Sequence, residues 1–111
     1  MDHRIQEILK KIENDISQQF VIGDLAASVH MSVSRLQHLF KKEVQSSIVK
    51  YVNNLRLQKA REFLETSHLY VKEIRIKIGV IDEAHFIRDF KRKFGETPNK
   101  YRQIFQSSRN G

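Results

Sequence analysis

Two stretches of the chain carry side chains of the kinds that read the edges of DNA bases. Gln37 can form two hydrogen bonds with adenine, and Arg35 and Arg88 can do the same with guanine. Each such pair discriminates against the wrong base by about 1 to 3 kcal/mol. The remaining candidates for base contact are apolar, hydroxyl, imidazole or carboxylate side chains, namely Val33, Ser34, His38, Glu83, Ala84 and His85. Val33 could cover a thymine methyl group, and Glu83 could accept from a cytosine amino group.

Basic residues close both stretches and provide charge without base preference. The candidates for phosphate contact are Ser32, Lys41, Lys42, Lys91 and Arg92, and Lys93 adds to the same basic end. With 20 Lys and Arg against 13 Asp and Glu, the chain has a formal net charge of +7 and a pI of about 9.9. Double-stranded DNA is therefore the first candidate partner, and RNA or an acidic protein remains the alternative.

Nothing in the sequence indicates catalysis, and we expect no cofactor and no metal. The chain has no cysteine, which excludes disulfides, zinc fingers and thiol chemistry. The five histidines are scattered, and only His85 with Asp82 or Asp89 comes near metal-ligand spacing. Four phenylalanines could stack on single-stranded bases, but their helical spacing is typical of a core, and they are Phe40, Phe86, Phe90 and Phe94.

The elements that must position these residues are helices. Apolar residues recur at helical spacing over about 3–18, 25–29, 33–44, 47–66, 71–78, 83–94 and a short last segment after Pro98. No stretch alternates with period two, so we expect an all-α fold of about seven helices. Ser32, Ser47 and Asp82 stand where helix N-caps are expected. Gly79 and Gly95 stand where a left-handed residue ends a helix.

The same spacing predicts which apolar residues are buried. In the first helix they are Ile5, Ile8, Leu9, Ile12 and Ile16. In the long helix they are Ile48, Tyr51, Val52, Leu55, Ala60, Phe63 and Leu64. The last short helix is expected to be held by Tyr101, Ile104 and Phe105.

The chain contains an internal repeat. Leu36, Phe40 and Tyr51 are matched by Phe86, Phe90 and Tyr101, each 50 positions later. The short helix upstream is matched at an offset of 49, so the second copy has one extra residue in its turn. Two copies of a short helix, a turn and a second helix predict two helix-turn-helix units, within 1–46 and 68–111, joined by a linker helix over 47–67.

The sequence resembles the AraC/XylS family of bacterial transcription regulators from about Phe20 to Tyr101. The first unit and the linker helix carry the resemblance in Asp24-Leu25-Ala26, Ser32, Arg35-Leu36, Leu39-Phe40-Lys41-Lys42 and Leu55-Arg56-Leu57-Gln58-Lys59-Ala60-Arg61. The second unit carries it in Glu73-Ile74, Ile78-Gly79, Asp82, Phe86, Arg88, Phe90-Lys91-Arg92, Phe94-Gly95-Glu96-Thr97-Pro98 and Tyr101-Arg102.

This resemblance implies two homeodomain-like units whose recognition helices enter successive major-groove segments about 34 Å apart. It places base contacts at Val33, Ser34, Gln37 and His38 and at Glu83, Ala84, His85 and Arg88. It also implies no catalysis, a possible contact with RNA polymerase, and dimerisation, if any, through a domain outside this chain, which would itself be monomeric. No apolar run approaches the roughly 18 to 20 residues of a membrane span, and we expect the bacterial cytoplasm, at the nucleoid.

Three residues depart from the family pattern. Gln45 stands where a glycine usually ends the first recognition helix, which predicts a turn looser or strained by ~1 kcal/mol. Arg75 replaces a small alanine, so its charged end must point outward or push the helices apart. Val80 replaces a phenylalanine and removes core volume. Together these changes predict a less regular second unit, and they make the first unit the stronger candidate for sequence reading.

Overall fold

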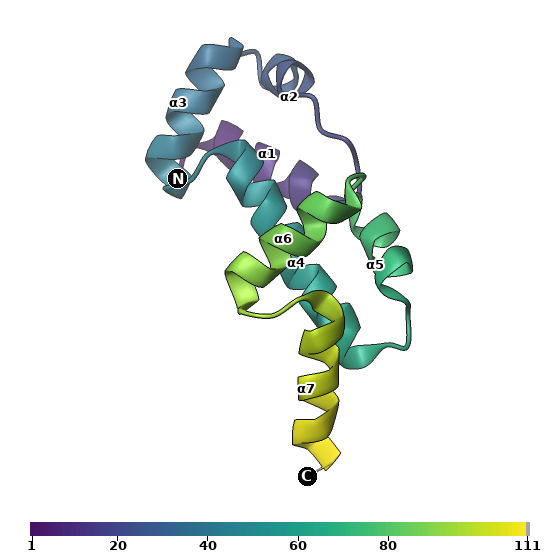
Figure 1. The fold of residues 1–111 in the computed structure, drawn as a ribbon. Helices are drawn as coiled ribbons and strands as arrows, with labels where there is room; N and C mark the ends of the chain where they lie inside the picture. Colours follow the sequence, from purple (N-terminus) through teal and green to yellow (C-terminus); the bar gives the residue numbers. More distant parts are fainter. Residues whose placement is uncertain (111) are drawn as a thin grey trace. The chain divides into compact units, whose positions relative to one another are not determined.

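The computed structural model describes residues 1–110, and this part of the chain is all α-helical, as predicted (Figure 1). Its helices are α1 (His3–Asn14), α2 (Ile22–Ser28), α3 (Val33–Val44), α4 (Ile48–Thr66), α5 (Val71–Ile78), α6 (Glu83–Phe94) and α7 (Pro98–Asn110). No helix among these residues is long and apolar enough to cross a membrane.

The chain divides into two compact units. The first unit is Met1–Asn54, and the second comprises the rest of the chain from Leu55. The division falls inside α4, so the first turns of this helix belong to one unit and the later turns to the other.

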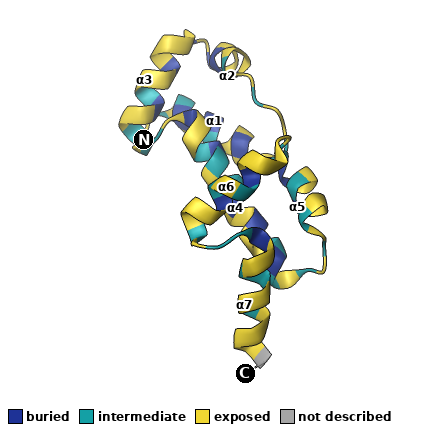
Figure 2. Cartoon of the chain, in the orientation of Figure 1, coloured by how far each residue is buried: buried dark blue, intermediate teal, exposed yellow. Residues whose placement is uncertain are grey.

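The core of the first unit is formed by α1, α2, α3 and the start of α4. Its fully or nearly fully buried side chains are Ile5, Ile8, Ile12, Leu25, Ala26, Val29, Met31, Leu36, Phe40, Ile48 and Val52. In Figure 2 these appear as dark blue segments on helices whose other faces are exposed. Burial of large apolar side chains stabilises by about 1.5 to 3 kcal/mol each, so this stripe holds α3 in place.

The core of the second unit is built from the corresponding helices, namely the later turns of α4 together with α5 and α6. Leu57, Ala60 and Leu64 of α4 pack with α5 and α6, whose buried residues are Ile74, Ile78, Phe86 and Phe90. Partly buried residues packed against this cluster are Phe63, Leu69, Val71, Val80, Ile87, Phe94 and Tyr101. Every phenylalanine predicted as core in α3 and α6 is therefore buried or packed against the core.

The internal repeat extends further toward the N-terminus than predicted. Ile5, Ile8 and Ile12 of α1 are matched in α4 by Leu57, Ala60 and Leu64, each 52 positions later and each buried. Thus α1 is the first helix of the first unit, and the second part of α4 is the corresponding first helix of the second unit.

The phenols of Tyr51 and Tyr101 show the same correspondence. The hydroxyl of Tyr51 donates to Glu13 at 2.8 Å, and that of Tyr101 donates to Glu65. Burial, together with the bond to the neighbouring carboxylate, raises the pKa of each tyrosine to about 12. Each tyrosine therefore ties the closing helix of its unit to the opening one.

Two predicted helix limits were wrong. Helix α1 ends at Asn14, not near residue 18, because Asp15 is extended and its carboxylate accepts from the Ser17 amide at 3.0 Å. Such a local side-chain bond competes with helix continuation. Helix α2 begins at Ile22, earlier than the predicted Leu25, since the carbonyl of Val21 accepts from Leu25 at 3.1 Å.

The predictions for the long helix and for the last helix also needed correction. Leu57 is buried although the predicted stripe of the long helix omitted it, because this helix serves two cores and its stripe steps by five residues after Val52. The last helix is not short: α7 has 13 residues. Ile104, predicted to be buried, is 47% exposed, and Tyr101 packs on Phe90 instead at 5.7 Å between ring centroids.

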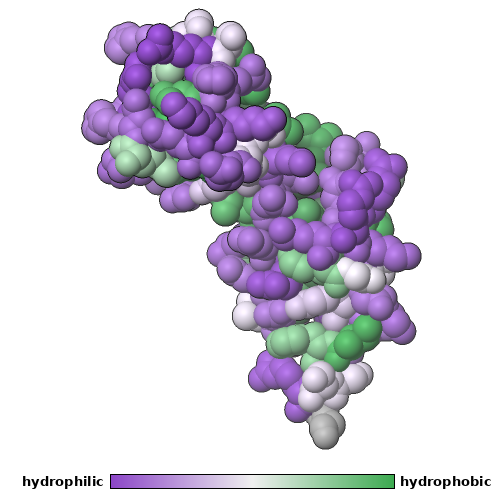
Figure 3. Space-filling view, turned by 90° about the vertical axis from the view of Figure 1, so that its left-hand side faces the viewer, coloured by the Kyte–Doolittle hydropathy of each residue, from purple (hydrophilic) through white to green (hydrophobic). Residues whose placement is uncertain are grey.

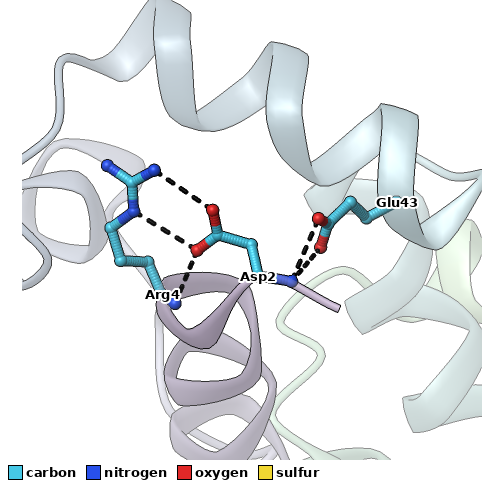
Figure 4. A network of polar contacts seen from close by, with 3 residues as sticks. All are labelled: Asp2, Arg4 and Glu43. Atoms are coloured by element: carbon cyan, nitrogen blue, oxygen red, sulfur yellow. Dashed lines mark hydrogen bonds and ion pairs between the residues drawn. The ribbon is translucent and has the colours of Figure 1, made fainter.

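The N-terminal residues are fixed to α3 (Figure 4). The Asp2 amide donates to both carboxylate oxygens of Glu43, at 3.0 and 2.9 Å. The Asp2 carboxylate caps α1 by accepting from the Arg4 amide at 2.8 Å, and the Arg4 guanidinium bonds to the same carboxylate. These bonds from Arg4 hold the pKa of Asp2 below its ordinary value. Glu43, the acidic residue of α3, is thereby turned toward α1.

Candidate nucleic-acid interface

Helix α3 begins at the predicted cap. The hydroxyl of Ser32 accepts from the Arg35 amide at 3.1 Å, and Leu36 and Phe40 bury the inner face of the helix. The opposite face presents exposed candidates for base contact, namely Val33, Ser34, Arg35, Gln37 and His38. No hydrogen bond or ion pair ties the side chains of Arg35, Gln37 or His38 within the described chain. They are therefore available to a ligand without loss of an internal contact.

Helix α6 has the same construction and a different outer face. Asp82 caps it by accepting from the His85 amide at 3.0 Å, and this bond lowers the pKa of Asp82. Phe86 and Phe90 are buried beneath it. The exposed candidates on this helix are Glu83, Ala84, His85 and Arg88. Among these candidates His85 has a partner, because its Nε2 lies 3.0 Å from Asp89, which also lies 3.6 Å from Arg92.

All five phosphate candidates are exposed: Ser32, Lys41, Lys42, Lys91 and Arg92. The lysines and Arg92 lie in the last turns of α3 and α6, where a cation also interacts favourably with the helix dipole. Figure 3 shows hydrophilic residues over most of the face that it presents. Each recognition helix therefore offers base-reading candidates near its start and basic groups at its end.

The turns before the two recognition helices differ by the one residue that the repeat predicted. His30 and Gly79 take up the left-handed conformation, with φ of 58° and 83°. The amide of Met31 donates to Ala26, and the amide of Val80 donates to Arg75 in the corresponding bond. From the left-handed residue to the cap, however, the chain runs two positions to Ser32 and three positions to Asp82.

Arg75 stabilises the longer turn. Its Nη1 donates to the carbonyl of Val80 at 2.9 Å and to that of Ile81 at 2.7 Å. The guanidinium thus bonds to the turn, while Ile74 and Ile78 of the same helix remain fully buried. Its Nε is buried without a hydrogen bond in the described structure. The second unit accommodates both departures, because Arg75 bonds to the turn and Val80 packs against the core.

Known proteins decide what this arrangement is. A family model described as a helix-turn-helix domain matches residues 25–104. The arabinose operon regulatory protein of Escherichia coli is 29% identical over 103 residues, which are 92% of this chain and 35% of that protein. The chain belongs to the AraC-type helix-turn-helix family. It is a DNA-binding domain of transcription regulators and not an enzyme.

Two solved structures of AraC-type domains have the same fold. The C-terminal domain of AraT, a response regulator from Geobacillus stearothermophilus, has a TM-score of 0.86 and 25% identity, over 93% of this chain and 86% of that one. The DNA-binding domain of AdpA, a global transcriptional factor solved in complex with a target DNA, has a TM-score of 0.91 and 24% identity, over 98% of both chains. The chain spans about a third of the length of the curated relatives it matches.

The AraC-type signature contains one residue, Arg102, whose structural role could not be predicted from the sequence. Arg102 donates to the carbonyls of Leu64, Ser67 and Leu69 at 3.1, 3.1 and 2.6 Å, and more weakly to Phe63. These bonds satisfy carbonyl groups at and just after the C-terminal end of α4, so Arg102 is not available as a phosphate contact. The only signal in the sequence was its place beside Tyr101 in the signature.

The end of the first recognition helix confirms the conformation expected at Gln45. Gln45 is left-handed with φ of 66°, where the second unit has Gly95 with φ of 89°. The Gln45 side chain donates to the carbonyl of Lys42 at 3.1 Å, which offsets part of the backbone cost.

In the described residues no group of three metal-ligating side chains exists, so the His85 and Asp89 pair has no third ligand.

Proposed function

We propose that this AraC-type domain reads duplex DNA by inserting α3 and α6 into the major groove. The observation that carries the proposal is the two-sided construction of both helices. Each has two fully buried residues on one side and a row of exposed polar residues, starting at a capped N-terminus, on the other. A helix fits the major groove, and its first turns reach the base edges.

The proposed base contacts are assigned by side-chain chemistry. Gln37 pairs with adenine, Arg35 and Arg88 pair with guanine, and Val33 covers a thymine methyl group. The other proposed base contacts are Ser34, His38, Glu83, Ala84 and His85. Because α3 presents three polar candidates without an internal partner in the described chain, Arg35, Gln37 and His38, whereas His85 of α6 is paired with Asp89, we propose that α3 contributes the stronger sequence preference.

The proposed phosphate contacts are Ser32, Lys41, Lys42, Lys91 and Arg92. The oxygen of Ser32 accepts in the cap, and its hydroxyl hydrogen is free to donate to a phosphate. The basic residues bring charge to the ends of α3 and α6, which favours binding to any duplex.

In this proposal the helix over 47–67 joins the parts 1–46 and 68–111 and contributes turns to the core of each unit, and the chain binds as a monomer. We propose that the protein regulates transcription, because the proteins that match it are operon regulatory proteins. Contact with RNA polymerase stays a prediction from the family resemblance.

The proposal is tested by titrating the protein with three probes of equal length: a duplex selected from a random pool, a scrambled duplex and single-stranded RNA. We expect the selected duplex to bind at least a thousandfold more tightly than the scrambled one at moderate salt. Equal affinity for all three probes would contradict sequence reading, and a preference for RNA would support the alternative of an RNA-binding module.

The salt dependence separates phosphate contacts from base contacts. Lys42→Ala should weaken binding to all duplexes and lower the slope of log affinity against log salt by about one. Lys10→Ala is the matched control, because Lys10 is an exposed lysine on α1, outside both recognition helices. It should leave the slope nearly unchanged. Equal slopes for the two variants would show that α3 does not approach the phosphates.

A further inference from the structure

A single carboxylate in α6 contacts two residues of the proposed interface. Asp89 Oδ2 lies 3.0 Å from Nε2 of His85, one turn earlier, and Oδ1 lies 3.6 Å from Nη1 of Arg92. The Asp89 side chain is only 14% exposed, whereas those of His85 and Arg92 are 59% and 74% exposed. The carboxylate therefore lies beneath the two side chains that reach outward.

The first unit has no such carboxylate. Leu39 occupies the position in α3 that matches Asp89 at the repeat offset of 50, and it is partly buried. Arg35 is the residue that matches His85. A leucine thus suffices for the scaffold at this position, and the carboxylate of α6 serves something other than packing.

The contact with Asp89 determines which ring nitrogen of His85 carries a hydrogen. At 3.0 Å from a carboxylate oxygen, Nε2 must carry a hydrogen, since two lone pairs would repel each other. In the neutral ring Nδ1 is then an acceptor, and it is the nitrogen left for a ligand. An acceptor in the major groove recognises the amino group of adenine or of cytosine.

We propose that Asp89 is a positioning residue that orients His85, so that its free ring nitrogen accepts from the amino group of adenine or cytosine. This inference rests on the proposed function, because it assigns the base that α6 reads at His85. Asp89 does not touch the DNA itself.

Stability does not explain the carboxylate. The cationic partners of Asp89 are mostly exposed, and ion pairs with such partners contribute about 0 to 1 kcal/mol to folding. A negative charge beneath a DNA-facing surface also opposes the attraction of that surface for phosphate. A residue that gains little stability and weakens general affinity is expected to act on selectivity.

Two substitutions separate positioning from charge. Asp89→Asn removes the charge but keeps an oxygen that can accept from Nε2, whereas Asp89→Leu removes both and installs the residue of the first unit. Both variants should bind a scrambled duplex more tightly than the parent and to the same extent. Only Asp89→Leu should lose base preference at the position read by His85, by about five- to tenfold. Asp89→Asn should retain that preference within about twofold.

A double-mutant cycle with His85→Ala shows whether Asp89 acts through His85. In the His85→Ala background we expect Asp89→Leu and Asp89→Asn to give the same base preference at every position. Thermal unfolding, followed for each variant, should show that all of them remain folded at the binding temperature.

The outcomes are distinct. If Asp89→Leu leaves the preference unchanged, or if Asp89→Asn loses as much as Asp89→Leu, the positioning role is overturned. If the parent selects a sequence and His85→Ala leaves it unaltered, the assignment of His85 is wrong while the proposed function stands. If the parent itself shows no sequence preference, the proposed function fails first.

Discussion

The two helix-turn-helix units have the same scaffold and different outer surfaces. In the first, the rings of Phe40 and Tyr51 pack edge to face at 5.7 Å, with 76° between their planes. In the second, Phe90 and Tyr101 pack at 5.7 Å and 83°. The outer surfaces differ, because α6 carries an internal ion-pair network and α3 does not. The packing is thus the same in the two units, whereas the exposed residues of α3 and α6 differ.

The departures from the family pattern follow the same division. Arg75 and Gln45 both stand where a smaller residue is usual, and each is accommodated by hydrogen bonds to nearby carbonyls. Neither changes the buried stripe of its unit. The backbone at a turn therefore tolerates an unusual residue where that residue can bond to the turn itself.

The largest expected effect comes from removing a core ring. Phe40→Ala and Phe90→Ala should each cost about 3 to 5 kcal/mol, since both side chains are fully buried. If the units are equivalent scaffolds, the two costs should agree within about 1 kcal/mol. Amide hydrogen exchange should locate the loss in Met1–Asn54 for Phe40→Ala and after Leu55 for Phe90→Ala. A loss spread evenly over both units would contradict their separate cores.

The next largest effect concerns the turn that differs between the units. Arg75→Ala removes two hydrogen bonds from a charged group and should cost about 1.5 to 3 kcal/mol in urea unfolding. The reciprocal change, Ala26→Arg, should cost at least as much, because Ala26 is 1% exposed and its unit has the shorter turn. If Arg75→Ala is neutral, the guanidinium does not support the longer turn.

A smaller effect is expected from the tyrosine hydroxyls. At neutral pH, Tyr51→Phe and Tyr101→Phe should each cost about 0.5 to 1.5 kcal/mol through one lost hydrogen bond. In the folded protein each pKa is raised from 10.0 to about 12, so this stabilisation is complete below pH 10. It is lost as the pH rises from 10 to 12, because the unfolded chain releases its protons first.

Each phenylalanine variant should therefore show a shallower fall in stability between pH 10 and 12 than the parent. Tyr70→Phe is the control, since Tyr70 is 77% exposed, and it should match the parent. Equal slopes for Tyr101→Phe and the parent would show that the bond to Glu65 is absent in solution.

The smallest effect has opposite signs in the two units. Gln45→Gly should stabilise by at most about 1 kcal/mol, because glycine takes up the left-handed conformation without strain. Gly95→Gln should destabilise by a similar amount. A Cβ at Gly95 meets nothing within 4 Å, so backbone strain alone sets this cost. Thermal melting of both variants measures the difference, and a stabilising Gly95→Gln would refute the account.

Much of the fold could be predicted from the sequence because its signals are local. The caps at Ser32 and Asp82, the left-handed Gly79 and Gly95, and the stripes of Leu36 with Phe40 and Phe86 with Phe90 each depend on residues within a few turns. The exposure of the candidate base contacts followed from the same stripes, and their contact with DNA stays a prediction.

What could not be predicted depends on residues distant in the chain. Arg102 bonds to carbonyls more than 30 positions away, and no spacing rule identifies such acceptors. The burial of Leu57 could not be predicted, because α4 contributes to two cores and its buried stripe shifts where the units meet in sequence. The match of α1 to α4 in Ile5, Ile8, Ile12 and Glu13 has an offset of 52, which differs from the offsets of 49 and 50 in the rest of the repeat.

Selection from random duplexes, with unit-specific variants, tests the central claim most directly. The parent should select two sequence segments about one helical turn apart. Gln37→Ala should erase base preference within one segment, and Arg88→Ala should erase it within the other, while each leaves the second segment intact. A single segment that both variants alter, or a selected motif that neither variant changes, would contradict the claim that both units read DNA.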